Sequence, residues 1–210
     1  EQALVWAEKI LLHATGGLGD VGSHLLHRDV MRFDDEICAL EDVDVIIGNP
    51  PWGALGAGRA AAALGMPVAN ANTFGVFLLR CLNSLAPGGR LGFVLPRNFF
   101  KGNDYQFLRS ELLQQTALEW LGCAGRAFPG VTQEVVVLVV RRLCPGEIPD
   151  EVRIVSVPRL EEKRCSLVRV LDQATILGIP GNVIPLTADR HILRILDTME
   201  QAAGPWRLRD

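Results

Sequence analysis

The sequence has few cysteines, and their arrangement limits the protein classes to which it can belong. The five cysteines, Cys38, Cys81, Cys123, Cys144 and Cys165, are widely spaced and contain no Cys-x-x-Cys pair. Because disulfide frameworks and zinc sites need an even or closely spaced set, this pattern favours free thiols in a reducing compartment. We therefore expect a cytoplasmic protein that holds no metal ion.

Long apolar runs are also missing. The longest aliphatic run, Val135–Val140, is far shorter than the ~20 residues that cross a bilayer. The first residues, Glu1–Leu12, mix charged and apolar side chains and do not resemble a secretory signal. The sequence therefore predicts no membrane association.

Positive charge is scarce for a protein that binds nucleic acid. Lys and Arg together number 21 against 24 Asp and Glu, which gives a net charge of −3, and the only lysines are Lys9, Lys101 and Lys163. DNA-binding proteins usually carry a basic face. The overall charge therefore disfavours a self-sufficient DNA-binding protein and leaves room for a basic domain elsewhere.

Strands and helices alternate along the chain, which predicts an α/β sheet. We expect a catalytic domain over residues 1–145, followed by an extension over residues 146–210. The expected strands are His24–Val30, Val43–Gly48, Arg90–Leu95, Ala117–Leu121, Glu134–Arg141 and Val152–Val157, and the expected helices are Glu1–His13, Thr73–Leu85, Tyr105–Gln115 and Ala188–Ala203.

The most informative stretch is Asn49-Pro50-Pro51-Trp52, which directly follows the apolar strand Val43–Gly48. Proline cannot donate to a sheet ladder, so the strand must end there. Asp29 follows another predicted strand. Open α/β sheets bind ligands beyond the carboxyl ends of their strands, so these residues mark the expected site.

This motif and its surroundings resemble the adenine-N6 DNA methyltransferases of restriction-modification and phage-defence systems. The motif matches their Asn/Asp-Pro-Pro-aromatic pattern. Further similar stretches follow in the same order as in the family: Phe74–Pro96, Arg97–Leu113, Ala127-Phe128-Pro129 and Val135–Arg141. The resemblance covers roughly residues 1–142 and implies a Rossmann-like S-adenosylmethionine-dependent methyltransferase sheet.

The chemistry explains the motif. The exocyclic amine of adenine is a poor nucleophile until hydrogen-bond acceptors hold its two N–H groups. The Asn49 side chain and the Pro50 carbonyl supply two such acceptors, and Pro51 fixes the direction of that carbonyl. Trp52 would stack on the flipped-out base, and by resemblance Phe128 supplies the second face.

The resemblance implies S-adenosylmethionine as cofactor. Asp29 would accept a hydrogen bond from the cofactor adenine, Val30 would pack nearby, and Asn49 would lie beside the methyl group. The family's glycine-rich cofactor loop is not found; Gly16-Gly17-Leu18-Gly19 follows a predicted helix, which is the wrong context. We therefore expect a sheet that is incomplete at its N-terminal side.

Two alternatives remain open. A methyltransferase of a protein glutamine amide or an RNA base amine would share the Asn-Pro-Pro-aromatic motif. A non-catalytic DNA-binding or assembly subunit would explain the missing glycine-rich loop. The residues beyond 142 and the position of Phe128 before a predicted strand favour DNA, because the sheets of the other amine methyltransferases usually end soon after the last hairpin. By the same resemblance, the extension over residues 146–210 leads toward a target-recognition domain.

Overall fold

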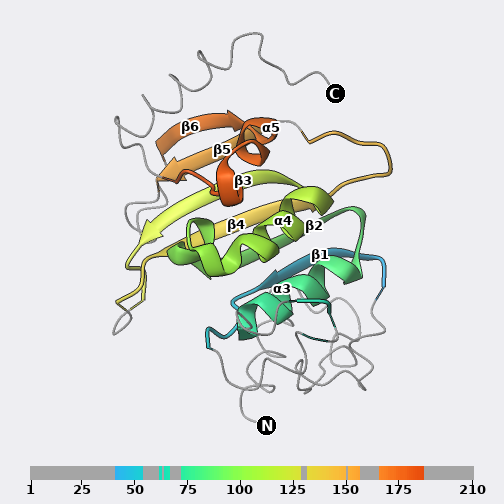
Figure 1. Ribbon diagram of the computed structural model, residues 1–210, viewed down its shortest axis with the longest axis horizontal. Coiled ribbons are helices and arrows are strands. Elements are labelled where there is room, and N and C mark those ends of the chain that lie inside the picture. The colour runs from blue at the N-terminus through green and yellow to red at the C-terminus, as the bar shows by residue number, and fades with distance from the viewer. Residues whose placement is uncertain are drawn as a thin grey trace, which may run out of the picture.

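The computed structural model describes residues 41–53, 62, 64–66, 72–128, 132–149, 151–156 and 166–186. In this part of the chain, six strands form one sheet in the order β1-β2-β4-β3-β5-β6 (Figure 1). The elements are β1 Val43–Gly48, α3 Thr73–Ser84, β2 Leu85–Pro96, η4 Arg97–Phe100, η5 Asn103–Tyr105, α4 Gln106–Gln115, β3 Thr116–Gly125, β4 Val135–Arg142, β5 Glu151–Ser156, β6 Ser166–Asp172, α5 Gln173–Leu177 and η7 Pro180–Asn182.

Strand directions bring several loops to one edge of the sheet. β1 is parallel to β2, β4 is antiparallel to both β2 and β3, and β5 is parallel to β3. The carboxyl ends of β1, β2, β3 and β5 therefore share an edge with the amino end of β4. We call this edge the carboxyl edge.

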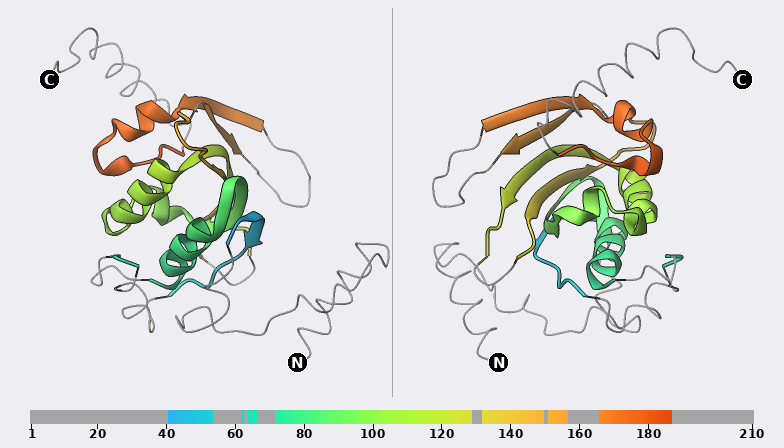
Figure 2. Two further views of the ribbon diagram at one scale, coloured as in Figure 1. Left: turned by 90° about the vertical axis from the view of Figure 1, so that its right-hand side faces the viewer. Right: turned by 60° about the vertical axis from the view of Figure 1, so that its left-hand side comes forward.

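Helices α3, α4 and α5 cover one face of the sheet (Figure 2). Leu91, Phe93 and Leu95 alternate along β2 and are buried beneath them. Period-two alternation of this kind is what one covered face requires. The helices approach closely where a side chain is absent, because a Cβ on Gly75 of α3 would lie 2.6 Å from Leu108 Cδ1 of α4.

The opposite face is much less covered over β1. Val45 and Ile47 are 59% and 83% exposed, and they pair with Arg90 and Gly92 of β2. Among the described residues, β1 pairs with β2 alone. The motif-bearing strand therefore lies at one end of the described sheet and exposes apolar side chains.

The strand and helix predictions for the described region are confirmed, with shifts at their ends. β2 begins at Leu85 rather than Arg90 because Pro87-Gly88-Gly89, whose residue types are typical of a turn, forms an irregularity within the strand, where Gly88 has a φ of 81°. β6 and α5 were not predicted. The predicted elements Glu1–His13, His24–Val30 and Ala188–Ala203 lie outside the described residues.

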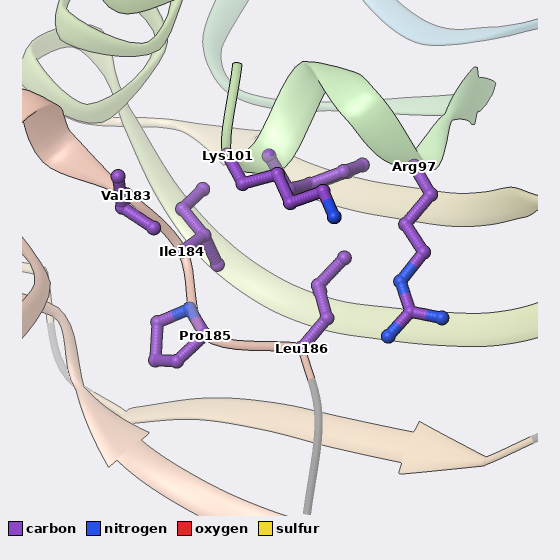
Figure 3. Close-up of a pocket in the computed structure, with 7 residues that line it drawn as sticks. Arg97, Lys101, Val183, Ile184, Pro185 and Leu186 are labelled. Atoms are coloured by element: carbon purple, nitrogen blue, oxygen red, sulfur yellow. The ribbon is translucent and has the colours of Figure 1, made fainter. Parts of the chain in front are cut away.

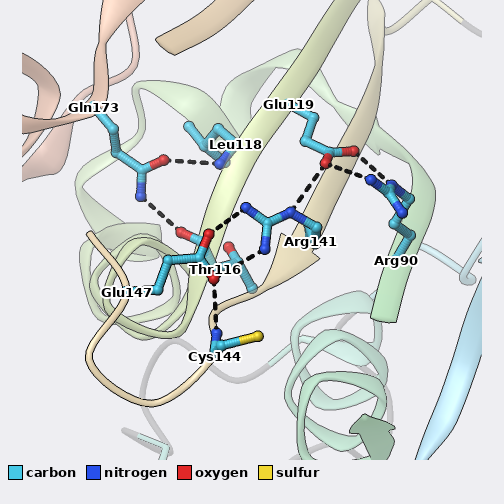
Figure 4. Close-up of polar contacts among 8 residues, drawn as sticks. All are labelled: Arg90, Thr116, Leu118, Glu119, Arg141, Cys144, Glu147 and Gln173. Atoms are coloured by element: carbon cyan, nitrogen blue, oxygen red, sulfur yellow. Dashed lines mark hydrogen bonds and ion pairs between the residues drawn. The ribbon is translucent and has the colours of Figure 1, made fainter. Parts of the chain in front are cut away.

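The described part of the predicted extension continues the same sheet through β5 and β6. Gln173 of α5 fastens it to the core, since its fully buried amide accepts from Leu118 N at 2.8 Å and donates to the Leu113 and Thr116 carbonyls at 3.0 and 2.7 Å (Figure 4). That the extension leads toward a target-recognition domain stays a prediction.

Arg109 of α4 makes a second such connection. Its guanidinium is fully buried and donates to four carbonyl oxygens, those of Phe99 and Gly102 at 2.6 and 2.7 Å, and those of Gly181 and Asn182 at 2.7 and 3.0 Å. A buried charge is tolerated only when it is fully hydrogen-bonded. Arg109 thus joins the loop after β2 to the segment after α5.

Candidate active site

The Asn-Pro-Pro-Trp motif lies at the carboxyl edge, directly after β1. Gly48, the last residue of β1, pairs with Phe93 of β2. The motif therefore begins beside the last residues of β2, which ends at Pro96. Asn49 and Pro51 are exposed, Pro50 is buried, and Trp52 is half-buried. The Asn49 side chain therefore faces solvent at the edge where sheets of this class bind ligands.

Both ends of the motif are held in place. β1 fixes its start through the ladder with β2. At its other end, the Gly53 carbonyl accepts from the backbone N of Thr73 at 2.7 Å and from its hydroxyl at 3.0 Å. Thr73 opens α3, and its predecessor Asn72 caps that helix by accepting from Gly75 N at 2.8 Å. The motif thus spans a short distance between a strand and a capped helix.

Proline stiffens this short connection. Each proline fixes its own φ and restricts the residue before it, so Asn49 and Pro50 are both restricted by their successors. A stiff, doubly anchored turn fixes the direction in which the Asn49 side chain leaves the backbone. Such a turn can present the Asn49 amide oxygen as a preorganised hydrogen-bond acceptor.

Trp52 packs against the hydrophobic core that α3 and β2 share. Its Nε1 is buried and has no hydrogen-bond partner in the part of the chain that the structure describes. A buried donor left unpaired costs about 1–3 kcal/mol, so this N–H is an energetic liability that an acceptor would relieve. That the indole stacks on a base stays a prediction.

Phe128 follows β3, which ends at Gly125 with a φ of 60°. Its ring is 37% exposed. The strand directions place it at the same edge as Asn49, with β2 and β4 between their strands. The structure therefore brings Phe128 to the predicted edge, and its contact with a base stays a prediction.

The sequence analysis overlooked Arg97 and Glu134 at this same edge. Arg97 directly follows β2, Glu134 directly precedes β4, and their side chains form an ion pair. The Arg97 backbone N also donates to the Glu134 carbonyl at 2.8 Å. Arg97, like Asn49, is a polar residue just after a buried strand, and this position is the sequence signal that marks it.

The cysteines near the core do not act as nucleophiles at neutral pH. Burial raises the pKa of Cys81 to about 11, against a smaller lowering by Arg80. Burial also raises the pKa of Cys123; nearby Arg97 lowers it and Glu134 raises it. Both thiols therefore stay protonated, and a thiolate that would compete for an electrophile is not formed at either position.

Some predictions concern residues that the structure does not describe. Asp29 and Val30, assigned to the cofactor, lie outside the described residues, as does most of the loop Gly53–Pro67. Within the described ranges, no three His, Cys, Asp or Glu side chains gather as a metal site would need. In those same ranges no helix has the length and apolar character to cross a membrane.

Comparison with known proteins identifies related methylases. Residues 24–122 match the profile of the Eco57I restriction-modification methylase family. The chain is 28% identical over 195 residues to the type II methyltransferase M.VspI of Vibrio sp. (strain 343), covering 90% of this chain and 46% of that protein. It is 30% identical over 115 residues to the type II methyltransferase M.TthHB8I of Thermus thermophilus, covering 49% and 27%. The chain spans less than half the length of either relative.

Solved structures resemble the fold. The type IIG restriction endonuclease BpuSI is similar with a TM-score of 0.57 at 16% identity, over 79% of this chain and 22% of that one. The M protein of the type I restriction enzyme EcoKI is similar with a TM-score of 0.46 at 20% identity, over 63% and 28%. The predicted fold class, an open α/β sheet, is confirmed by the strand order and by the similarity to BpuSI.

Proposed function

We propose that this chain belongs to the restriction-modification methylases that it resembles, and that it is the catalytic core of a DNA methyltransferase that methylates the N6 amine of adenine. The single observation that carries the proposal is the placement of Asn49. Its side chain is exposed at the carboxyl edge, on a turn that β1 and α3 hold at both ends.

Two acceptors on this turn would activate the amine. The N6 lone pair of adenine is delocalised into the ring, which makes the nitrogen a weak nucleophile. When the Asn49 amide oxygen and the Pro50 carbonyl accept the two N–H groups, they favour tetrahedral nitrogen and free the lone pair. The extra proton leaves to solvent after the transfer, so no strong general base is needed.

The described residues suit S-adenosylmethionine, which supplies an electrophilic methyl group on sulfonium. Asn49 offers a neutral oxygen at the carboxyl edge, which can lie beside a sulfonium methyl group without attacking it. Asn49 would border the cofactor, and we assign Asp29 and Val30 to its adenine. These residues bind and orient; alignment of the amine with the methyl group then carries much of the rate.

The target base would leave the duplex to reach this edge. An amine paired inside DNA cannot contact Asn49, so the nucleotide must be flipped out. Trp52 and Phe128 are the aromatic residues that we assign to the two faces of the flipped base. The exposure of Phe128 at the carboxyl edge supports its part of this assignment.

We propose that further parts of the protein complete this fold. The edge of β1 that pairs with no strand of the described region, and the exposed Val45 and Ile47, fit additional strands of a methyltransferase sheet, including the glycine-rich cofactor loop. A target-recognition domain after residue 210 would provide the basic surface that the net charge of −3 lacks.

The test is to identify the methylated atom. The complete gene product is incubated with DNA and S-adenosylmethionine labelled on its methyl group, and the DNA is digested to nucleosides for mass spectrometry. We expect label in N6-methyladenine. Label in cytosine, in RNA alone or in a glutamine side chain would overturn the proposal in favour of another amine acceptor.

A further inference from the structure

A pocket lies beside the candidate active site, between the loop after β2 and the segment after α5. It measures about 180 Å³ and is lined by Arg97, Phe100, Lys101 and residues 183–186. Figure 3 shows Arg97 and Lys101 extending from one wall, while Val183–Leu186 runs along the other. The volume is several times the ~30 Å³ that one water occupies, so the pocket can take a larger group.

Buried hydrogen bonds hold both walls. Arg109 donates to the Phe99 and Gly102 carbonyls of one wall and to the Gly181 and Asn182 carbonyls at the start of the other. The backbone N of Ile184 also donates to the Phe100 carbonyl at 2.9 Å, directly between the walls. The pocket is therefore a fixed feature of the fold and does not depend on loose surface side chains.

The charges around the pocket match one anion. Arg97 is paired with Glu134, whereas Lys101 has no carboxylate partner among the described residues. Cys123, near Arg97 and Glu134, has a raised pKa and stays neutral. Arg97, Lys101 and Glu134 together leave one net positive charge above a floor formed by Phe100, Ile184 and Leu186. Apolar surroundings strengthen the attraction for an anion.

The pocket is close enough to the motif to serve the same ligand. Asn49 directly follows Gly48, which pairs with Phe93, so Arg97 lies three residues beyond the level of Asn49 on the neighbouring strand. At about 3.3 Å per residue and about 4.8 Å between strands, their backbones are separated by roughly 11 Å. That separation suits a phosphate one or two nucleotides from a base held at Asn49.

We propose that this pocket binds a backbone phosphate of the DNA strand that carries the flipped base, with Lys101 and Arg97 as its cationic contacts. The proposal rests on the proposed DNA substrate and adds a binding site to it. Phosphate contacts fix the register of a protein on DNA and carry no sequence information. The pocket would thus anchor the strand while the motif handles the base.

The experiment measures binding of the complete gene product to two labelled duplexes of unrelated sequence over a series of salt concentrations. In Arg97→Gln/Lys101→Gln, we expect about tenfold weaker binding to both duplexes and a salt dependence reduced by about one released counterion per lost phosphate contact. The single variant Lys101→Gln breaks no ion pair among the described residues and should show part of this loss.

Two further variants separate a binding role from a structural one. Arg90→Gln is the matched control, because Arg90 lies in β2, the strand that Arg97 follows, and it too pairs with a glutamate, Glu119 at 2.9 Å. It should change binding less than twofold. Glu134→Gln frees Arg97 and removes a negative charge, so it should tighten binding severalfold.

The outcomes divide cleanly. Binding by the double variant equal to that of Arg90→Gln, or weaker binding by Glu134→Gln, overturns the phosphate site while the proposed methylation stands. If the unaltered protein neither binds nor methylates DNA, the proposed function fails and the phosphate site with it. In the supporting outcome, KM for DNA rises in the double variant while kcat stays within about twofold.

Discussion

The two ends of the described sheet use polar side chains in opposite ways. Toward β5 and β6, Arg109 and Gln173 are fully buried. Both donate hydrogen bonds to backbone carbonyls, and Gln173 also accepts one from a backbone N. Toward β1, Asn49 is exposed at the end of the strand, and the strand's outer face shows Val45 and Ile47. Buried hydrogen bonds stabilise the end at β5 and β6, whereas the end at β1 exposes polar and apolar side chains.

The buried polar residues therefore serve stability, whereas the exposed asparagine is available for chemistry. A buried polar group whose bonds are all made within the protein has none left for a ligand. An exposed acceptor on a stiff turn keeps its bonding capacity for a substrate. Substitutions of the buried Arg109 and Gln173 should therefore lower the free energy of unfolding, whereas substitution of the exposed Asn49 should lower activity alone.

The largest loss of stability should come from Arg109→Met. The change removes the guanidinium donor from four carbonyls, those of Phe99, Gly102, Gly181 and Asn182, and so weakens the connection between the loop after β2 and the segment after α5. We expect unfolding free energy to fall by about 3–5 kcal/mol in denaturant titrations. Arg153→Met, on an exposed side chain of β5, is the control and should change it by about 0.5 kcal/mol or less. An equal fall in unfolding free energy in the two variants would show that the hydrogen bonds of Arg109 do not stabilise the fold.

Gln173→Leu should have the next largest effect. It removes an acceptor from Leu118 N and donors from the Leu113 and Thr116 carbonyls, all at a buried position. Buried groups left unpaired cost about 1–3 kcal/mol, so the free energy of unfolding, obtained from thermal denaturation, should fall by that amount. Gln114→Leu removes an exposed amide from the neighbouring helix and should leave the transition nearly unchanged. A larger effect of the control would contradict the contrast between buried and exposed amides.

A smaller effect is expected at the open face of β1. Ile46 and Ile47 are adjacent but point to opposite faces; Ile46 packs against the core and Ile47 is 83% exposed. In this chain, Ile46→Ala should cost about 2 kcal/mol and Ile47→Ala about 0.5 kcal/mol or less. In the complete gene product the two costs should become similar, because the proposed additional elements would cover Ile47. Unchanged costs there would contradict that part of the proposal.

The smallest effect is a pH dependence at the end of β4 away from the motif. Hydrogen bonds from Arg141 and from the backbone N of Cys144 lower the pKa of Glu147 to about 2, from 4.5 (Figure 4). The folded pKa is the lower one, so Glu147 contributes stability above pH 4.5, and this contribution is lost as pH falls toward 2. Glu147→Gln should therefore flatten the decline of stability in acid. An unchanged acid limb would show that the ion pair contributes nothing to folding.

The sequence predicted the elements with strong periodicity and the motif, but not the groups that fasten the sheet. β4 is a run of aliphatic residues, and Asn-Pro-Pro-Trp interrupts a strand abruptly; both are local patterns. Arg109 lies in an amphipathic helix, where an arginine is normally solvated, and its partners Gly181 and Asn182 are more than 70 residues away. Such burial comes from tertiary packing, which local patterns do not contain.

β6 illustrates the same limit. Ser166–Asp172 is the last strand of the described sheet and contains an arginine. The alternation of apolar and polar residues in it is weak, so its sequence resembles that of a loop. Its place is set by pairing with β5. Arg97 was not predicted for a different reason. Its position after a buried strand is visible in the sequence, but its ion pair with Glu134 depends on the pairing of β2 with β4.

The most direct test compares two exposed asparagines at the carboxyl edge, Asn49 after β1 and Asn98 after β2. Methyl transfer to DNA is measured in single turnovers for the complete gene product carrying Asn49→Ala or Asn98→Ala. Loss of the Asn49 acceptor should slow transfer by about 10²–10³-fold with little change in unfolding free energy, and Asn98→Ala should retain the full rate. Normal transfer by Asn49→Ala would contradict the claim that this side chain activates the amine.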